Sequence, residues 1–314
     1  MCSEPLEKAI VDFGADVAFG KVPQKLEEHY GIKIPESTAK RIVYKHAKIM
    51  SQGKKDIAKN KKTEARCIFG SADGVMVPIV NVNKDENKTD LRKSRSTCWK
   101  EVRLALGCKK GSISPSYAAV IGSTDEAGDI LEDCIKREGL GDKTFLHIVA
   151  DGAPWIEEQV EKHFGSKAKF LIDFYHVSEY LAEAGKCCCP EDPKGWLKSS
   201  QDCMKESNIE RVFSQLRSHT NEKCPMGKDC PAKKCLNYLE KRVSHLDYKS
   251  ALEQDLPIGS GAIESGNRHV IQARLKISGA WWKKENVQPM LDLRTLRANG
   301  DWNLYWQDKR LGYS

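Results

Sequence analysis

Hydrophobic residues in the first fifty positions recur mostly every three to five residues, a spacing typical of helices. The pattern predicts one helix over Val22 to Tyr30, a turn over Gly31 to Pro35, and a second helix over Thr38 to Met50. Two short helices around a glycine-containing turn fit a helix-turn-helix, although any small helical hairpin gives the same pattern. We therefore expect residues 1–50 to form a helical, helix-turn-helix-like DNA-binding region. The polar, lysine-rich residues 51–65 are expected to form a basic linker.

The period of the pattern then changes from helix to strand. Strands are expected over Cys67 to Phe69, Val75 to Val82, Glu101 to Leu106, Tyr117 to Ile121, Thr144 to Ala150 and Lys169 to Ile172, with helices over Asp125 to Lys136 and Trp155 to Phe164. From His176 to about Leu256 the pattern is helical and polar. The fold class expected is α/β, a sheet covered by helices and interrupted by an inserted helical domain. The first part of this core takes residues 66–185, the insertion 186–256, and the returning part 257–314.

Composition limits the class of protein. The chain has 314 residues, 40% of them hydrophobic and 30% charged, which is enough for a buried core in two or three units. It opens with no secretory leader and contains no apolar run of membrane-spanning length, so we expect a cytoplasmic protein that does not enter a membrane. The 12 cysteines are then expected to be reduced. Several lie between Cys187 and Cys235 near His219 and His245, but without a Cys-x-x-Cys pair free thiols are favoured over a zinc site.

The positive charge is unevenly distributed. The net charge is +7, and lysines and arginines crowd the stretch from Lys40 to Arg66, where only Asp56 and Glu64 oppose them. This is either an electrostatic footprint for nucleic acid or a solvated helix face. Residues expected to contact DNA, here and near the C-terminus, are Lys40, Arg41, Lys45, Lys48, Lys54, Lys55, Arg268, Arg274 and Lys276.

Three acidic residues stand in contexts that could bring them to one site. Asp73 lies inside an apolar strand, where a carboxylate costs free energy unless it is paired or binds a metal. Asp151 closes a buried strand, the place where open α/β sheets put their sites, although it could simply cap the next helix. Glu264 opens a helix-like stretch after Gly259-Ser260-Gly261. Carboxylates on three segments suit a two-metal phosphoryl-transfer site that holds Mg²⁺ or Mn²⁺.

A second constellation joins Asp173 and His176 at a strand-to-helix junction. Residues three apart can meet on one face of the first helical turn. The alternative is an Asp that caps the helix beside a His satisfied elsewhere.

In order along the chain, these motifs resemble those of a known family. They are Asp-Gly-x-x-Val-Pro at Asp73, Ala-Asp-Gly-Ala at Asp151, Asp-x-Tyr-His-x-x-Glu-x-Leu at Asp173 and His176, and Gly-Ser-Gly-Ala-Ile-Glu-Ser at Glu264. The set resembles the insertion-sequence transposases of the Kra type, within the wider Mutator-like DDE group. The similarity runs from about Phe13 to Trp306.

The resemblance implies an RNase H-like catalytic core, a mixed sheet flanked by helices, with an α-helical insertion before the glutamate. It implies that Asp73, Asp151 and Glu264 are the catalytic acids and hold two Mg²⁺ or Mn²⁺ ions, and that Asp173 and His176 lie near the DNA or the active centre. The activity implied is cleavage and strand transfer at the ends of an insertion sequence. The partners implied are double-stranded DNA, from transposon ends and target, and further copies of the chain assembled on it, at the nucleoid.

Other readings stay open beside the transposase. Members of the family are usually longer at the N-terminus, so a shortened chain is expected. One alternative is accordingly a shortened or domesticated relative that binds DNA without catalysis. Another is a nuclease relative such as a resolvase, which shares the site and differs in substrate.

Overall fold

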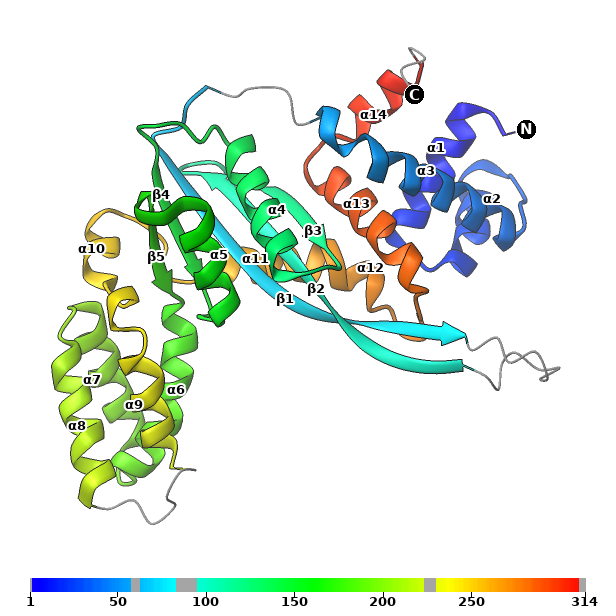
Figure 1. Ribbon diagram of the computed structural model, residues 1–314. Helices are drawn as coiled ribbons and strands as arrows, with labels where there is room; N and C mark the ends of the chain where they lie inside the picture. The colour runs from blue at the N-terminus through cyan, green and yellow to red at the C-terminus, as the bar shows by residue number, and fades with distance from the viewer. Residues whose placement is uncertain (1, 58–62, 83–94, 223–229, 311–314) are drawn as a thin grey trace. The chain divides into compact units, whose positions relative to one another are not determined.

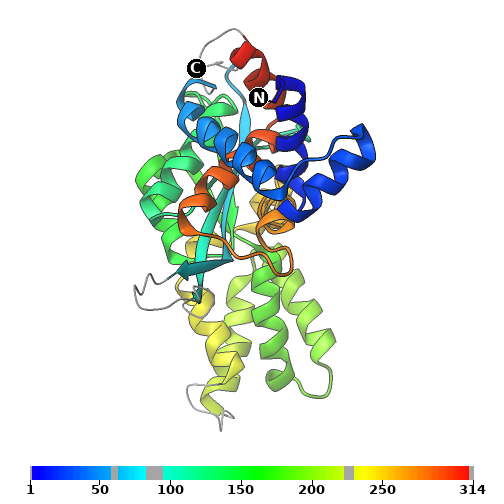
Figure 2. The ribbon, with the colours of Figure 1, turned by 90° about the vertical axis from the view of Figure 1, so that its right-hand side faces the viewer.

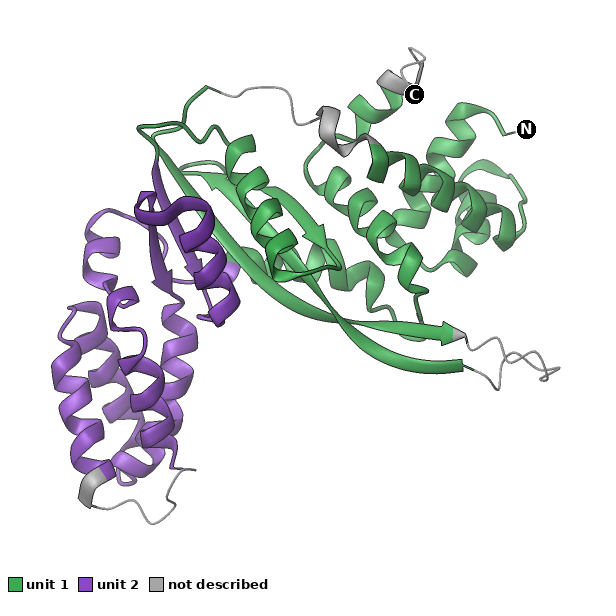
Figure 3. Ribbon diagram, in the orientation of Figure 1, with its two compact units in different colours: residues 1–144, 262–314 green, residues 145–261 purple. Residues whose placement is uncertain are grey.

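The chain folds into two compact units. The structure, a computed structural model, describes residues 2–57, 63–82, 95–222 and 230–310. Unit 1 comprises residues 1–144 and 262–314, and unit 2 comprises residues 145–261 (Figure 3). Both units contain strands and helices, so the α/β class expected from the sequence is confirmed. Among the described residues, no helix combines the length and the apolar character needed to cross a membrane.

The sheet of unit 1 is antiparallel. Strand β1 (Cys67–Val82) pairs with β2 (Arg95–Lys109), which pairs in turn with β3 (Ser116–Val120). The pattern predicted β1 as two shorter strands, but the ladder with β2 runs through the intervening residues without a break. Asp73 therefore lies inside a strand, as expected, opposite Leu104. Continuous pairing satisfies the backbone groups of this segment, which explains why its glycines do not end the strand.

Helices complete unit 1 from both ends of its sequence. They are α1 (Glu4–Asp16), η1 (Phe19–Lys21), α2 (Val22–Tyr30), α3 (Glu36–Ile57), α4 (Thr124–Arg137), α11 (Gly261–Gly266), the π-helical turn η5 (Asn267–Gln272), α12 (Ala273–Leu275), η6 (Lys284–Asn286), α13 (Val287–Ala298) and α14 (Trp302–Arg310). The C-terminal α13 packs against α1 and α3 (Figure 1, Figure 2). The N-terminal and C-terminal parts of the chain thus share one core.

The N-terminal helices follow the expected pattern closely. Helix α2 has the predicted bounds and ends at Gly31, whose φ of 66° lets the chain turn where other residues would be strained. Helix α3 buries Ala39, Val43 and Ala47 along one face, at helical spacing. It continues to Ile57, into the stretch expected as a linker, because lysine and glutamine favour helix and no proline stops it.

Unit 2 begins with a parallel strand pair. Strands β4 (Phe145–Ala150) and β5 (Ala168–Ile172) are connected by α5 (Pro154–Phe164) and the short turn η2 (Gly165–Lys167). This is a βαβ unit, in which the crossover helix permits parallel pairing. Buried residues run without interruption from Leu146 to Ala150, as is usual for a strand covered on both faces.

The remainder of unit 2 is helical. It consists of α6 (Phe174–Cys188), α7 (Pro193–Lys205), α8 (Ile209–Glu222), α9 (Pro231–Glu240), η4 (Val243–His245) and α10 (Tyr248–Glu253). Helix α6 follows β5 directly and packs along α7 and α9. The inserted helices expected from residue 186 onward are therefore continuous with the βαβ unit, and the compact body that contains them starts at Phe145.

Candidate active site

In unit 1, the Asp73 carboxylate is held from two directions. Its Oδ1 accepts a hydrogen bond from the backbone N–H of Gly74 at 2.7 Å. Its Oδ2 accepts one from the side-chain amide of Asn267 at 2.5 Å. Asp73 is half-buried in the sheet, where an ionised carboxylate needs such donors. A residue near the C-terminal end of the chain therefore defines the environment of an acid on β1.

Asn267 has a further property that matters for ligand binding. Its side chain is buried, with 2% of its surface exposed, and its Oδ1 has no hydrogen-bond partner among the described residues. Leaving a buried amide oxygen unsatisfied costs about 1–3 kcal/mol. Since the same amide group contacts Asp73, the orphan oxygen lies beside the carboxylate. Carboxylate and amide oxygens together are the ligands of hard divalent cations.

Glu264 lies on α11, three residues before Asn267, and is exposed. The segment that carries Glu264 therefore contacts Asp73 through Asn267. A π-helical turn begins at Asn267, and such turns occur frequently at functional sites. Gly266 allows the close approach: a Cβ added there would come within 2.7 Å of Tyr117 and 3.0 Å of Leu104.

In unit 2, Asp151 follows β4 in a tight turn. Its Oδ1 accepts a hydrogen bond from the backbone N–H of Ala153 at 2.9 Å, and Gly152 adopts a φ of 80°. The backbone carbonyls of this turn are held by the inserted helices. The Tyr238 hydroxyl donates to the Asp151 carbonyl at 2.8 Å, and the Arg242 guanidinium donates to the Gly152 carbonyl at 2.8 Å.

The sequence did not predict a role for Tyr238 or Arg242. The Arg242 guanidinium stacks 4.1 Å from the centre of the Tyr238 ring, so the two side chains act as one support for the turn. Burial raises the pKa of the Tyr238 hydroxyl, which keeps it protonated and able to donate. Nothing in the local sequence marks either residue, because the turn lies about ninety residues earlier in the chain.

Asp173 is a buried, fully engaged carboxylate with 2% of its surface exposed. As the N-cap of α6, its Oδ1 accepts from the backbone N–H groups of Tyr175 at 2.6 Å and His176 at 3.0 Å. Its Oδ2 accepts from the backbone N–H of Ser260 at 2.6 Å and also from the Ser260 hydroxyl. Asp173 thus fixes the end of the segment that leads to Glu264.

Of the two arrangements that the sequence left open, the pairing between the side chains of Asp173 and His176 is not present. The carboxylate binds the backbone of His176, because a cap position aims its oxygens at the first free N–H groups of the helix. The His176 ring instead lies 3.7 Å from Glu179 and contacts the rings of Tyr180 and Tyr238. The alternative that the sequence left open, an N-cap Asp beside a separately satisfied His, describes the geometry.

Most of the predicted DNA-contacting residues are exposed, and one is not. Exposed positions are Lys40, Arg41, Lys45 and Lys48 on α3, and Arg268 and Lys276 near the C-terminus; the side chains of Lys54 and Lys55 lie outside the described residues. Lys45 forms an ion pair with Glu7 at 3.3 Å.

The expectation that Arg274 extends the basic surface is wrong. Its side chain is buried, with 1% exposed, and its Nε donates to the Gly14 carbonyl at 3.0 Å. The guanidinium lies over the rings of Phe19 and Trp282, at 4.6 and 4.9 Å from their centres. Burial lowers the pKa of Arg274 to about 10. The side chain therefore cross-links the core of unit 1, and aromatic faces replace the solvent that a surface arginine would use.

The three acids predicted to share metal ions are divided between the units. Asp73 and the Glu264 segment are joined in unit 1 through Asn267, whereas Asp151 belongs to unit 2. Convergence of all three carboxylates on one metal pair remains a prediction.

One solved structure has a weak similarity to this chain. The crystal structure of NurA with manganese covers 86% of this chain and 65% of that chain, with 14% sequence identity and a TM-score of 0.12. A similarity of this size carries no argument about fold or function.

Sequence relatives are more informative. Three proteins of Caldanaerobacter subterraneus subsp. tengcongensis are 29%, 27% and 27% identical over 190, 245 and 190 residues. These matches cover 59%, 76% and 59% of this chain but only 38%, 48% and 38% of the relatives, so the chain spans less than half their length. Each is named a UPF0236 protein, and the name of the third joins eleven locus designations of that organism. The model of an uncharacterised protein family, UPF0236, matches residues 2–310, and the chain therefore belongs to this family.

Proposed function

We propose that this chain is a DDE transposase of an insertion sequence, of the Kra type, and that its catalytic acids Asp73, Asp151 and Glu264 lie on an RNase H-like core. The observation that carries the proposal is the hydrogen bond between Asp73 and Asn267. It joins an acid in the middle of a strand to the helical segment that bears a second acid, across most of the chain. A structural Asp at this position would need the amide N–H of Asn267, but it gives no reason for the unsatisfied amide oxygen beside it.

The donor set fits the metal that such a reaction needs. Asp73 offers carboxylate oxygens, Asn267 an unsatisfied amide oxygen, and Glu264 an exposed carboxylate one turn earlier. Oxygen ligands favour Mg²⁺ or Mn²⁺ over softer ions. Bound there, two ions would lower the pKa of an attacking water or hydroxyl and stabilise the leaving oxygen.

The other residues of the proposed site position the acids and the DNA. Asp173 holds Ser260 and thereby fixes the start of the segment that carries Glu264. Tyr238 and Arg242 hold the turn that carries Asp151. The exposed cations Arg268 and Lys276 flank the Glu264 segment and are suited to DNA phosphates, whose neutralisation supplies most of the affinity for a duplex.

The relatives support a mobile element over a single-copy enzyme. One relative carries eleven locus designations of a single organism in its name. The same protein encoded at many places in one genome is what an element that copies or moves itself leaves behind. The relatives therefore fit a transposase.

Cleavage of end-containing DNA tests the proposal. The purified chain is incubated with duplexes that carry the element ends, in Mg²⁺ and in chelator. Asp73→Asn, Asp151→Asn and Glu264→Gln are each expected to lower the rate of strand cleavage by more than about a hundredfold, beyond the loss typical of residues that only support a metal ligand. Asp129→Asn, an exposed acid on α4, serves as the matched control and should cleave normally. Equal cleavage by Asp151→Asn and by the unmodified chain would sink the proposal.

A second candidate function is DNA binding without catalysis, favoured by the exposed lysines and arginine on α3. Binding of this kind persists in chelator and produces no nicks. A third reading, a resolvase-like nuclease, predicts cleavage without joining of the cut ends to a target duplex. A joining assay with labelled ends separates it from the transposase.

A further inference from the structure

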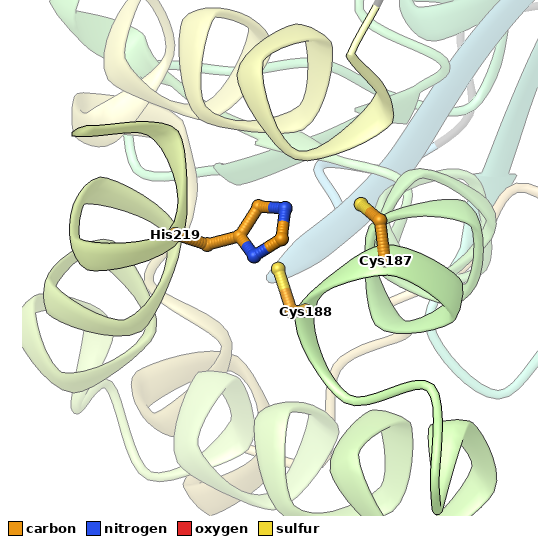
Figure 4. A group of neighbouring side chains, drawn as sticks. All are labelled: Cys187, Cys188 and His219. Carbon is orange, nitrogen blue, oxygen red and sulfur yellow. The ribbon is translucent and has the colours of Figure 1, made fainter. Parts of the chain in front are cut away.

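Two cysteines and a histidine converge within the helical part of unit 2. Cys187 and Cys188 end α6, and His219 lies in the last turns of α8. Their Sγ atoms and a ring nitrogen all lie within 4.8 Å of one another, although the residues come from different helices. Figure 4 shows both thiols and the imidazole directed into the same space between these helices.

Two more thiols lie on the neighbouring helix α9. Cys230, at the N-cap of α9, and Cys235, inside α9, are buried, with 2% and 0% of their surface exposed. Burial, then the neighbouring Cys187 and Cys230, together raise the pKa of Cys188 to about 12. Burial likewise raises the pKa of Cys235 to about 12, with contributions from Cys188 and Cys187. The thiols of α6 and α9 lie in one helical packing, because the two helices contact each other.

The donor types select a particular class of ion. Thiolates with an imidazole are the ligands of Zn²⁺ in closed structural sites, whereas Mg²⁺ and Ca²⁺ require oxygen. In a tetrahedral site with Zn–S bonds of about 2.3 Å, the ligand atoms lie about 3.8 Å apart. The observed separations are within 4.8 Å, so small side-chain rotations would bring the three ligands to bonding distance.

We propose that unit 2 carries a structural zinc site whose ligands include Cys187, Cys188 and His219. The ion would join the end of α6 to the last turns of α8. The sequence contains no Cys-x-x-Cys spacing that would predict this site. Its ligands are close together because helices α6 and α8 pack in the same bundle. The proposal goes beyond the DNA reaction and does not depend on it.

Ordinary reduced cysteines are the competing explanation. The Cys187 thiol donates to the Ala184 carbonyl at 3.1 Å, a local bond that a helical cysteine makes without any metal. Zinc binding replaces this bond, because the metal takes the thiolate and displaces its proton. The two states therefore differ in metal content, in proton release and in stability.

Zinc binding by the full chain is the direct test. The chain is purified under reducing conditions, freed of metal, and titrated with Zn²⁺ against a chromophoric competitor. We expect about one zinc ion per chain, with affinity lowered at least tenfold in Cys188→Ser and in His219→Gln. Cys203→Ser, which removes a thiol from α7 in the same unit, is the matched control and should bind zinc normally.

Thermal unfolding with and without chelator distinguishes loss of zinc binding from misfolding of a variant. Chelator should lower the Tm of the unmodified chain and of Cys203→Ser but leave that of His219→Gln unchanged, because only the former two hold the ion. Two results overturn the site: no zinc uptake by the folded, reduced chain, or equal affinity in His219→Gln and the unmodified chain. Neither measurement involves DNA, so failure here and failure of the proposed transposase are distinguishable.

Discussion

The two units hold their acids by different means. In unit 1, Asp73 sits in the middle of an antiparallel ladder, and its long-range donor, Asn267, lies 194 residues away in sequence. In unit 2, the Asp151 side chain is satisfied by a backbone N–H only two residues on. Among the described residues, the long-range hydrogen bonds to this turn go to its backbone carbonyls and not to the Asp151 carboxylate. Both carboxylates accept a hydrogen bond from a nearby backbone N–H, and among the described residues Asp73 adds a side-chain donor from a distant segment of the chain.

Each unit also buries a charged side chain, again by different means. Asp173 in unit 2 is surrounded by hydrogen-bond donors from its own helix and from Ser260. Arg274 in unit 1 donates a hydrogen bond from Nε to the Gly14 carbonyl and otherwise faces the rings of Phe19 and Trp282. The anion is stabilised by directed backbone dipoles, and the cation by aromatic faces and packing. Four predictions test this contrast.

Removal of Arg274 should give the largest effect. Arg274→Ala leaves a cavity between aromatic rings and an unsatisfied Gly14 carbonyl, which should lower the free energy of unfolding by about 3–4 kcal/mol. Equilibrium unfolding in urea measures the loss. Lys276→Ala, at an exposed position two residues on, should change stability by less than about 0.5 kcal/mol. Similar midpoints for the two variants would contradict the core role of Arg274.

Removal of Asp173 should destabilise unit 2 to a smaller extent. Asp173→Ala deletes a helix cap and the anchor of Ser260, with an expected loss of about 2–3 kcal/mol in urea unfolding. Asp192→Ala is the matched control, because Asp192 caps α7 through Gly195 and its expected loss is about 1 kcal/mol. If the two substitutions cost the same, the contact with Ser260 contributes nothing to stability.

Asn267→Ala tests the long-range half of the Asp73 environment. Loss of a residue that supports a metal ligand typically lowers metal affinity or activity about 10- to 100-fold. The rate of Mg²⁺-dependent DNA cleavage should fall by about that factor, and the variant should need a higher Mg²⁺ concentration. The rate is measured across a Mg²⁺ titration. Asn299→Ala removes another amide of unit 1, one that binds only the backbone of Tyr117, and should leave the Mg²⁺ dependence unchanged. An unaltered Mg²⁺ dependence in Asn267→Ala would remove Asn267 from the site.

The smallest effect is expected from pH. Burial lowers the pKa of His147, opposed by its hydrogen bond to the Pro257 carbonyl, and nearby Lys169 lowers it further. On acidification, His147 therefore takes up its proton first in the unfolded chain, near its ordinary pKa of 6.5. The contribution of the neutral, buried His147 to the free energy of unfolding is fully present above that pH and declines as the pH falls below it. His147→Gln keeps a donor for Pro257 and removes the titration.

Urea unfolding at pH 7 and pH 5 compares the variants. Acid should destabilise His147→Gln less than it destabilises the unmodified chain. His29→Gln, at an exposed histidine of unit 1, should respond to acid like the unmodified chain. An identical acid response in His147→Gln would show that the buried histidine does not contribute.

Local sequence determined most of the elements. The periodicity located α2, α5, β4 and β5 to within a few residues, because each buries a face or a run whose pattern is complete in its own residues. It also indicated that Asp73 lies inside a strand, since apolar residues continue on both sides. The periodicity did not predict the partners of the acids. Asn267, Tyr238 and Arg242 are ordinary polar residues in the sequence, and only the fold places them beside Asp73 and the Asp151 turn.

The same distinction applies to the error over Arg274 and to the cysteine cluster. Arg274 stands in a basic stretch and was assigned to the surface, but Phe19 and Trp282, from distant segments, enclose it. Cys187, Cys188 and His219 lack a metal-binding spacing, yet helix packing brings their ligand atoms together. Sequence alone determined secondary structure, overall charge and the candidate acids, because these follow from neighbouring residues. Only the tertiary structure decided which side chains are buried and which are partners, because both depend on contacts between segments far apart in the chain.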